Sequence, residues 1–522
     1  MKIRKVMKVL AVLSLLAVLG VSANASDFKG TAKLGWVLTD IDGNQSVYQP
    51  TYNLYEGPSF SLERFKYRFD NGIQFYGNLK NLTLNNRNAV LNVMKPGMFG
   101  VSFTNNQYRR TYSFDGDHFT RRNQTMGDVW FQPIEYVKIF GGYGITNKEG
   151  DLLRLYDIND LITLNNFDYK QQYYNAGVKL GYERRYLQAE YRGSTFSDEL
   201  DELGDRNYNR FRVTAVAPVP RYEKNFILNG GFQHYTNKVE NRDDTLSANT
   251  VWGGVRYYDR MGFFGRYSFI WDRARRTNDL TSTDNITHSV YAGRNWLGIG
   301  GATIGYHWKT NDDASYELRT NSYFFSGWIQ PITDVRVRAG FGTDNMEVES
   351  GRTLTGDRDY TKLWGSVQYK YKFGTARFKA ESRQVDNDDI STSTDYLRLA
   401  ADVSATYDQY GTITVAYAYL DGDYDNTNGS FDFKQHVLSW NLMSIERWKA
   451  QAGFSGTYYR TKCDLNVESF TLSFLGRYEF WPSYKIEVKY SAYNYDNLND
   501  RSLVYTQYYT SNVVELNLIK DF

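Results

Sequence analysis

The chain has 522 residues with 17% aromatic side chains, 8 Pro and 1 Cys, and its formal net charge is +2. A hydrophobic content of 41% with a mean hydropathy of −0.58 excludes a bundle of transmembrane helices, and the aromatic content excludes a disordered chain. The one Cys excludes a disulfide scaffold, and it excludes covalent haem attachment because that needs a Cys-x-x-Cys-His run. A large all-β protein remains.

The N-terminus has the pattern of a secretory signal peptide. Residues 9–21 are apolar, Ala23-Asn24-Ala25 has the form of a cleavage site, and the basic segment ahead of them holds Lys2, Arg4, Lys5 and Lys8. We therefore predict cleavage after Ala25, which divides the chain into a signal peptide, 1–25, and a single mature domain, 26–522. Loss of the four basic residues changes the formal charge to −2, so we expect no nucleic-acid partner.

Beyond residue 25 the chain alternates apolar and polar side chains, as half-buried β-strands do. In residues 335–341 the apolar side chains alternate with Arg336 and Arg338, and residues 363–373 and 485–490 follow the same period of two. No apolar run approaches the ~18 residues that a membrane-spanning helix needs. The mature chain is therefore predicted to consist of strands.

Two kinds of connection separate these segments. Tight turns, often with Pro, recur about every 37 residues between 220 and 482. Longer polar connections rich in Asp and Asn lie at 147–168, 343–359 and 421–430. This asymmetry is typical of outer-membrane barrels, so we predict a transmembrane up-and-down antiparallel β-barrel of about 26 strands (24–28), with short periplasmic turns and longer extracellular loops.

The last segment agrees with this fold. Val514, Leu516 and Leu518 share one face of a final strand with the terminal Phe522. This pattern is similar to the C-terminal signal that the outer-membrane barrel assembly machinery recognises. We expect the protein in the outer membrane of a Gram-negative bacterium, where its partners include membrane lipid, lipopolysaccharide and that machinery.

The charged side chains of the strands are predicted to face the lumen, because lipid requires an apolar outer face. Acidic side chains on that face are few, namely Glu190, Glu381 and Glu487. A basic lumen would concentrate anions or hold an acidic guest, although charges that only keep a wide channel wet would give the same pattern. The candidate binding residues are Lys66, Arg68, Arg210, Arg212, Arg336, Arg338, Lys370, Lys372, Arg377 and Lys379.

The strand number also sets the width of the lumen. About 26 strands give a backbone radius of roughly 26 Å and a lumen of about 40 Å, wider than in the 22-strand transporters that carry a plug. We expect no plug domain ahead of the first strand, and the connection at 147–168 is too short to close such an opening. Something other than this chain should fill the barrel.

The N-terminal quarter, residues 28–150, resembles the barrels of porin–cytochrome conduits of the MtrB/PioB type, although it lacks the N-terminal Cys-x-x-Cys of many members. The runs that carry the resemblance are Tyr52-Asn53-Leu54-Tyr55-Glu56-Gly57-Pro58, Lys95-Pro96-Gly97-Met98-Phe99, Tyr108-Arg109-Arg110 and Asp117-His118-Phe119-Thr120-Arg121-Arg122. The resemblance implies a 26-strand outer-membrane sleeve around multihaem c-type cytochromes, which take part in extracellular electron transfer. It implies no cofactor in this chain, because haem enters only through the partner.

Other motifs carry little. Asp421, Asp423 and Asp425 alternate and Asp432 stands at the twelfth position, as in Ca²⁺ loops, but Asn426 replaces the Gly at position six and a solvated loop is the simpler interpretation. The five His show no metal-ligand spacing, and no catalytic constellation can be argued from spacing, so we expect no enzyme activity. Two functions remain: a sleeve for a cytochrome, or a wide porin for small anionic solutes.

Overall fold

The computed structural model describes residues 28–113, 115–156, 161–200, 204–240, 244–277, 282–296, 298–313, 315–351, 356–387, 389–426, 429–464, 466–498 and 508–522. The predicted signal peptide and its cleavage site lie outside these residues. Within them, no helix is long and apolar enough to cross a membrane.

The described chain is almost entirely β-structure, with one 3-10 helix, η1, at Gln49–Thr51. The first half contains β1 Lys29–Gly43, β2 Gly57–Arg68, β3 Gln74–Lys80, β4 Asn88–Lys95, β5 Phe99–Thr111, β6 Phe119–Ile134, β7 Val137–Tyr156, β8 Leu161–Tyr182, β9 Arg185–Asp198, β10 Arg206–Pro218, β11 Phe226–Val239, β12 Asp244–Tyr258 and β13 Phe263–Arg276. The second half contains β14 Ser282–Trp296, β15 Gly300–Asp313, β16 Tyr316–Ile332, β17 Val335–Gly351, β18 Arg358–Tyr371, β19 Gly374–Asn387, β20 Thr392–Tyr407, β21 Gly411–Asn426, β22 Gly429–Ser444, β23 Ala450–Cys463, β24 Val467–Trp481, β25 Tyr484–Asn497 and β26 Tyr508–Asp521.

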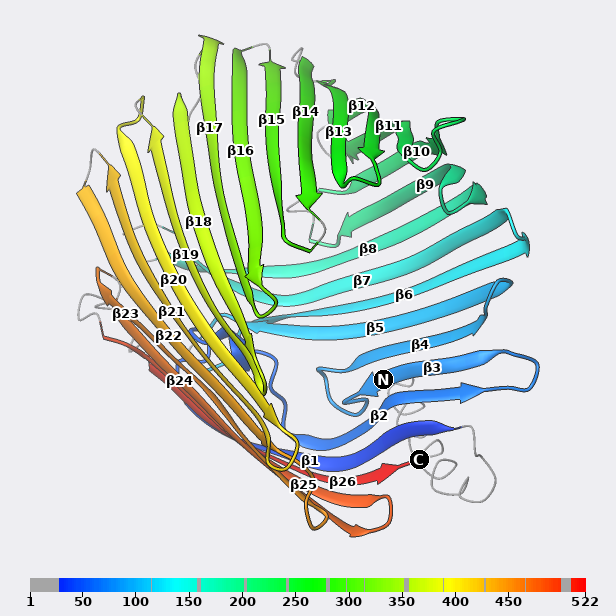
Figure 1. The fold of residues 1–522 in the computed structure, drawn as a ribbon. Coiled ribbons are helices and arrows are strands. Elements are labelled where there is room, and N and C mark those ends of the chain that lie inside the picture. The colour runs from blue at the N-terminus through cyan, green and yellow to red at the C-terminus, as the bar shows by residue number, and fades with distance from the viewer. Residues whose placement is uncertain are drawn as a thin grey trace.

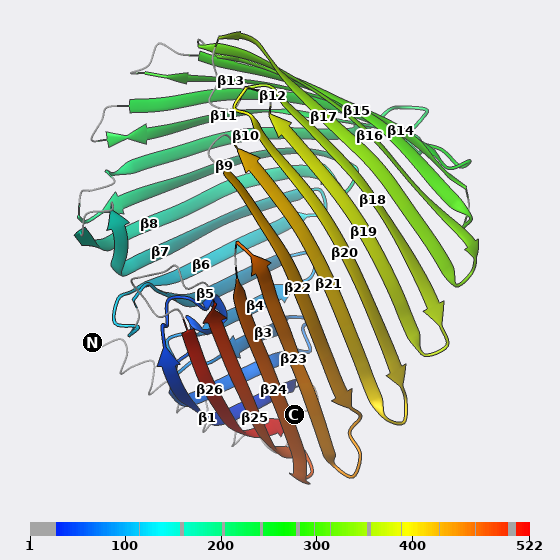
Figure 2. The same cartoon turned by 90° about the vertical axis from the view of Figure 1, so that its left-hand side faces the viewer.

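These 26 strands form one sheet that closes on itself. Strands that follow each other in the chain pair antiparallel, and β26 pairs antiparallel with β1 from Thr31↔Asp521 to Gly43↔Tyr509. Figures 1 and 2 both show β1 and β26 side by side, with the remaining strands forming the wall between them. The predicted all-β, up-and-down barrel is confirmed, and its strand number is the one expected from the sequence.

The chain ends hold this closure together. The Thr31 hydroxyl donates a hydrogen bond to the Asp521 carboxylate at 2.7 Å, and the Phe522 amide donates one to the Gly30 carbonyl at 2.9 Å. The Phe28 and Phe522 rings pack edge to face with their centroids 5.3 Å apart. The terminal aromatic side chain therefore packs at the seam between the first and last strands.

The two faces of the wall differ as the alternation predicts. On β1, Leu34, Trp36 and Leu38 are exposed on one face, while Lys33 lies on the other and pairs with Glu63 at 3.4 Å. An exposed apolar band is stable only against lipid, so the apolar face is the outer face and the charged face lines the lumen.

The two ends of the barrel also differ, though less than predicted. At one end, which we call the tight-turn end, connections such as 135–136, 183–184, 333–334 and 482–483 are as short as two residues. At the other, the loop end, the longest described connection is 44–56. The predicted loops at 147–168, 343–359 and 421–430 are wrong in extent, because β7, β8, β17, β18, β21 and β22 continue through most of them. Backbone pairing there continues past the point where the apolar–polar alternation fades.

Candidate functional site: the basic inner wall

The register places the candidate bases of β17 to β19 on the inner face. Arg338 pairs with Ser366, which pairs with Lys379, while the neighbouring positions Val367 and Phe378 are 42% and 48% exposed on the outer face. Arg336, Lys370 and Arg377 follow the same alternation. Lys372 is the exception, because β18 ends at Tyr371 and Lys372 lies in the following turn, with its ammonium 5.1 Å from the Phe373 ring centroid.

The same face carries further bases that sequence reasoning did not select. Lys362 lies opposite Arg383, and Arg398 lies opposite Glu381. They continue the alternation of the same strands toward the loop end, and extending the period would have found them. We call the whole set the basic wall; it consists of Arg336, Arg338, Lys362, Lys370, Arg377, Lys379, Arg383 and Arg398 on β17–β20.

One buried carboxylate organises part of the basic wall. The Glu381 side chain is 2% exposed and accepts hydrogen bonds from Lys379 at 2.7 Å and Arg383 at 2.6 Å, with the Lys362 ammonium 3.2 Å away. The Arg377 guanidinium likewise donates to Asp402 at 2.8 Å. A carboxylate with several cationic donors stays ionised, so Glu381 neutralises one of its three neighbours and leaves an excess of positive charge.

Three of the sequence-predicted bases of the basic wall have no carboxylate partner among the described residues, and neither does Arg398. The Arg336 guanidinium stacks over the Trp328 ring, 4.0 Å from its centroid. No ion pair or hydrogen bond from the side chains of Arg338 and Lys370 is present within the described part of the chain. These three groups are therefore available to an anionic guest or solute in the lumen.

The other candidate bases lie elsewhere around the wall. Arg210 lies 3.8 Å from Glu190, and Arg212 stacks over Trp252 with its guanidinium carbon 4.7 Å from the ring centroid. Lys66 and Arg68 lie at the tight-turn end of β2. The predicted residues thus line different sectors of one lumen and do not converge on a single pocket.

A segment that sequence reasoning did not single out as part of the lumen lies at the loop end. The loop 44–56 folds against the inner faces of β24 to β26, where the Tyr48 ring packs 6.0 to 6.1 Å from those of Tyr493, Tyr495 and Tyr509. Burial raises the pKa of the Tyr52 hydroxyl, which donates to the Ser46 carbonyl. The loop follows the wall and so leaves the lumen wide.

The runs that carry the family resemblance come together at the other end of this loop. Arg109 donates from its side chain to the carbonyls of Tyr52 at 2.8 Å and Leu54 at 2.9 Å. Its guanidinium also lies 4.5 Å from the Tyr55 ring centroid and 5.6 Å from that of Phe119. The short strands β3 and β4 belong to this sector, and Asn86 in the connection between them donates a hydrogen bond to the Asn53 carbonyl at 3.0 Å.

The four candidate calcium ligands do not form a loop. Asp421, Asp423 and Asp425 lie in β21, and Asp423 pairs across the ladder with Asp432 in β22. Alternate residues of a strand are about 7 Å apart, which is too far for three carboxylates to share one ion. Over the described ranges, no group of three or more His, Cys, Asp or Glu is placed to hold a metal ion.

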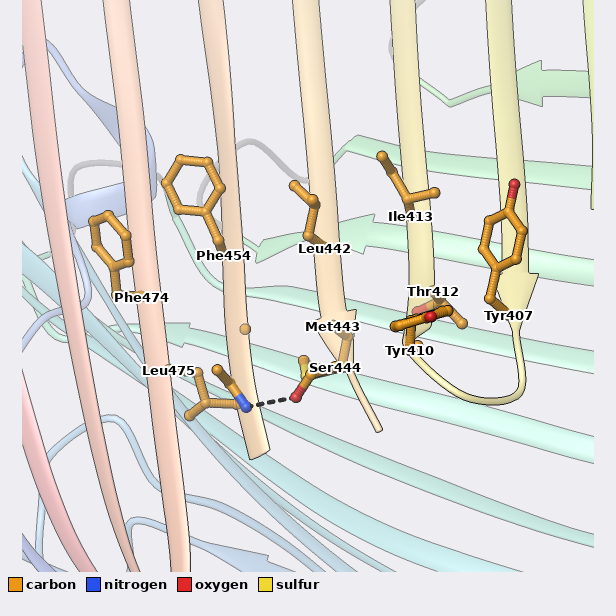
Figure 3. A pocket seen from close by; sticks show the side chains of 13 residues that line it. Tyr407, Tyr410, Thr412, Ile413, Leu442, Met443, Ser444, Phe454, Phe474 and Leu475 are labelled. Atoms are coloured by element: carbon orange, nitrogen blue, oxygen red, sulfur yellow. Dashed lines mark hydrogen bonds between the residues drawn. The ribbon is translucent and has the colours of Figure 1, made fainter. Parts of the chain in front are cut away.

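A pocket of about 480 Å³ lies on β20–β24 near the tight-turn end (Figure 3). Tyr407, Leu442, Phe454 and Phe474 line it, and the one hydrogen bond drawn there runs from the Ala452 amide to the Ser444 hydroxyl at 2.8 Å. Most of these side chains belong to the exposed outer face. The pocket has no titratable group suited to catalysis and is a depression in the apolar band.

No protein-family model matches the chain, and no curated protein matches it. Solved structures do match. A variant of the ferric enterobactin receptor PfeA of Pseudomonas aeruginosa is 8% identical with a TM-score of 0.50, over 95% of this chain and 80% of the receptor. The same receptor in complex with BCV-L6 is also 8% identical with a TM-score of 0.50, over 96% of this chain and 82% of the receptor. The ferric preacinetobactin receptor BauA of Acinetobacter baumannii is 7% identical with a TM-score of 0.49, over 95% of this chain and 80% of that receptor.

This chain has the fold of a large outer-membrane β-barrel. At such low identity, the likeness to the enterobactin receptor concerns the fold alone.

Proposed function

We propose that the protein is an outer-membrane sleeve, a barrel that embeds and insulates a multihaem c-type cytochrome in an electron conduit across the membrane. In this arrangement the tight-turn end faces the periplasm and the loop end faces outward. The haems belong to the partner, and this chain contributes the wall and its charges.

The observation that carries the proposal is the closed wall of 26 strands. Such a wall encloses a lumen of about 40 Å. The longest described connection, 44–56, packs along the wall and does not cross it. An unfilled opening of this width would breach the membrane, so a folded guest is the arrangement that keeps it sealed.

The charge of the inner wall and the family resemblance both indicate which kind of guest the lumen would hold. The basic wall carries more cations than Glu381 and Asp402 neutralise, which suits an acidic surface or haem propionates. Arg109 also contacts Tyr55 and Phe119, which belong to two other runs that carry the family resemblance. Three of the four runs therefore form one local structure, which supports the resemblance.

One observation favours a second function. Arg338 and Lys370 present unpaired charges to the lumen, as a porin for small anionic solutes would. A porin would contain no bound haem, and its lumen charges would act on ions in transit.

Purification from the native membrane separates the two functions. The sleeve should copurify with haem protein and absorb strongly in the visible, although this chain cannot attach haem c itself. The double variant Arg338→Glu and Lys370→Glu should lose most of that haem and stay folded, because neither side chain has an ion pair with a described residue. The matched control Lys170→Glu and Lys238→Glu, on the outer face, should retain it. A colourless wild-type preparation with stable anion-selective conductance would overturn the sleeve.

A further inference from the structure

A second cationic site lies on the outer face, away from the lumen. Near the loop end of β21–β23 the wall has a pocket of about 390 Å³, lined by Tyr417, His436, Leu438, Tyr458, Arg460 and Lys462. The Tyr417 hydroxyl lies 2.8 Å from Nδ1 of His436. These residues share their face with the exposed apolar side chains Leu438 and Leu442.

Basic side chains face each other across this ladder. His436 lies opposite Arg460, and Lys434 lies opposite Lys462. We call Lys434, Arg460 and Lys462 the outer cationic cluster. Like charges directly opposite each other destabilise a sheet unless an anion lies between them. A site of this kind therefore gains stability when it binds one.

The neighbouring acids leave the cluster only partly neutralised. Arg460 has Glu468 at 3.8 Å, and its Nε is buried without a hydrogen-bond partner. Asp421 lies opposite Lys434, and its carboxylate accepts a hydrogen bond from the Tyr419 hydroxyl at 2.8 Å. Among the described residues, neither Lys434 nor Lys462 has an ion pair.

The position of the cluster identifies the kind of anion. Four residues further along β22 than Lys434 is Leu438, opposite Tyr458, and beyond these Leu442 lies opposite Phe454. On the other side of the cluster, Asp423 and Asp432 lie opposite each other. The cations thus form a row between the apolar band and the acidic rim, at the level where lipid headgroups meet water.

We propose that the outer cationic cluster binds the phosphate of an anionic glycolipid of the outer leaflet, with the acyl chains against the apolar floor of the pocket. The phosphate accepts hydrogen bonds from Lys434, Arg460 and Lys462, and the ring of Tyr458 packs against the sugar. The proposal requires only that the barrel spans an outer membrane, and it is independent of what fills the lumen.

Binding to the purified full-length barrel in neutral detergent tests the site. The probe is lipid A, measured by native mass spectrometry or by the rise in unfolding temperature. Lys434→Gln with Lys462→Gln should weaken lipid A binding about tenfold or more, because two charged hydrogen-bond donors are lost. Lys434→Arg with Lys462→Arg should retain it.

The controls separate the sources of the effect. Lys170→Gln with Lys238→Gln removes the same charge from exposed positions on the outer face of other strands and should leave binding unchanged. Phosphatidylcholine should not bind at the site. Equal lipid A binding by wild type and the Gln pair overturns the proposal, and so does inorganic phosphate that binds as tightly as lipid A. Boiling-dependent migration confirms that each variant is folded, and none of these readouts involves haem.

Discussion

The hydroxyl of Tyr48, in the loop after the first strand, lies 2.8 Å from the hydroxyl of Thr471 in β24, 423 residues later in the chain. This contact fixes the loop 44–56 against the lumen side of the wall. The tyrosine rings of β25 and β26 complete the docking site.

Replacing Tyr48 by Ala should release this loop. The change removes the ring contacts and the hydrogen bond, so protease added to the folded barrel should cleave within 44–56 several times faster. Tyr48→Phe keeps the ring and should lose only about 1 kcal/mol of docking free energy. Identical cleavage rates for wild type and Tyr48→Ala would contradict the described packing.

Glu381→Gln should destabilise the barrel. It removes the carboxylate that three cations share and leaves them facing each other on the basic wall. The cations are only partly buried, so we expect a loss of about 1–3 kcal/mol in the free energy of unfolding in urea. Glu135→Gln, at an exposed carboxyl in a tight turn, is the control and should change stability by less than about 0.5 kcal/mol. Equal midpoints for the two variants would refute the assigned role of Glu381.

Conductance should depend on the free cations of the wall. If an empty barrel is inserted into a planar bilayer, Arg338→Glu with Lys370→Glu should lower the anion preference at about 10 mM salt, where screening extends ~30 Å. At 1 M salt the screening length is about 3 Å, so the difference between wild type and variant should vanish. An unchanged reversal potential at low salt would show that these side chains do not face the ion path.

Deleting Phe522 should slow barrel closure. The deletion removes the ring contact with Phe28 and the amide hydrogen bond to Gly30 at the seam. In a refolding experiment, the heat-modifiable form should appear several times more slowly than for wild type. Phe522→Tyr keeps the aromatic contact and should refold at the wild-type rate, and equal rates for the deletion would count against a role for this seam.

The alternation of side chains was sufficient to predict the faces of the wall. Around Arg336 and Arg338 the apolar partners alternate strictly because lipid lies on one side, so the sequence records which side chain points inward. The contrast fades toward the loop end, where both faces meet water. The alternation therefore predicts a loop for the segment that contains Asp421, Asp423 and Asp425, which the structure places in β21.

Contacts between distant segments could not be predicted in the same way. Nothing near Tyr48 in sequence indicates that it packs on β24 to β26. The pairing of Glu381 with Lys362 depends on the register between β18 and β19, and a slip of one residue would place that carboxylate on the outer face. The alternation of side chains within one strand does not determine which residue of the next strand lies opposite. The charge of the lumen likewise does not distinguish a bound guest from passing solutes. An acidic guest and a flow of small anions would both require basic side chains on the inner wall.

The short strands β3 and β4, with 7 and 8 residues, stand in the same ring as β7 and β8, with 20 and 22. Elastic deformation of a closed wall concentrates where the fewest backbone hydrogen bonds resist shear between neighbours. The cross-section should therefore flex mainly at the sector from β2 to β5, while the sector that contains the long strands β7 and β8 stays rigid. A barrel that is more flexible on one side can widen to admit a large guest and then narrow around it. The loop 44–56 contacts both β24 and β5, so it would hold the flexible side together.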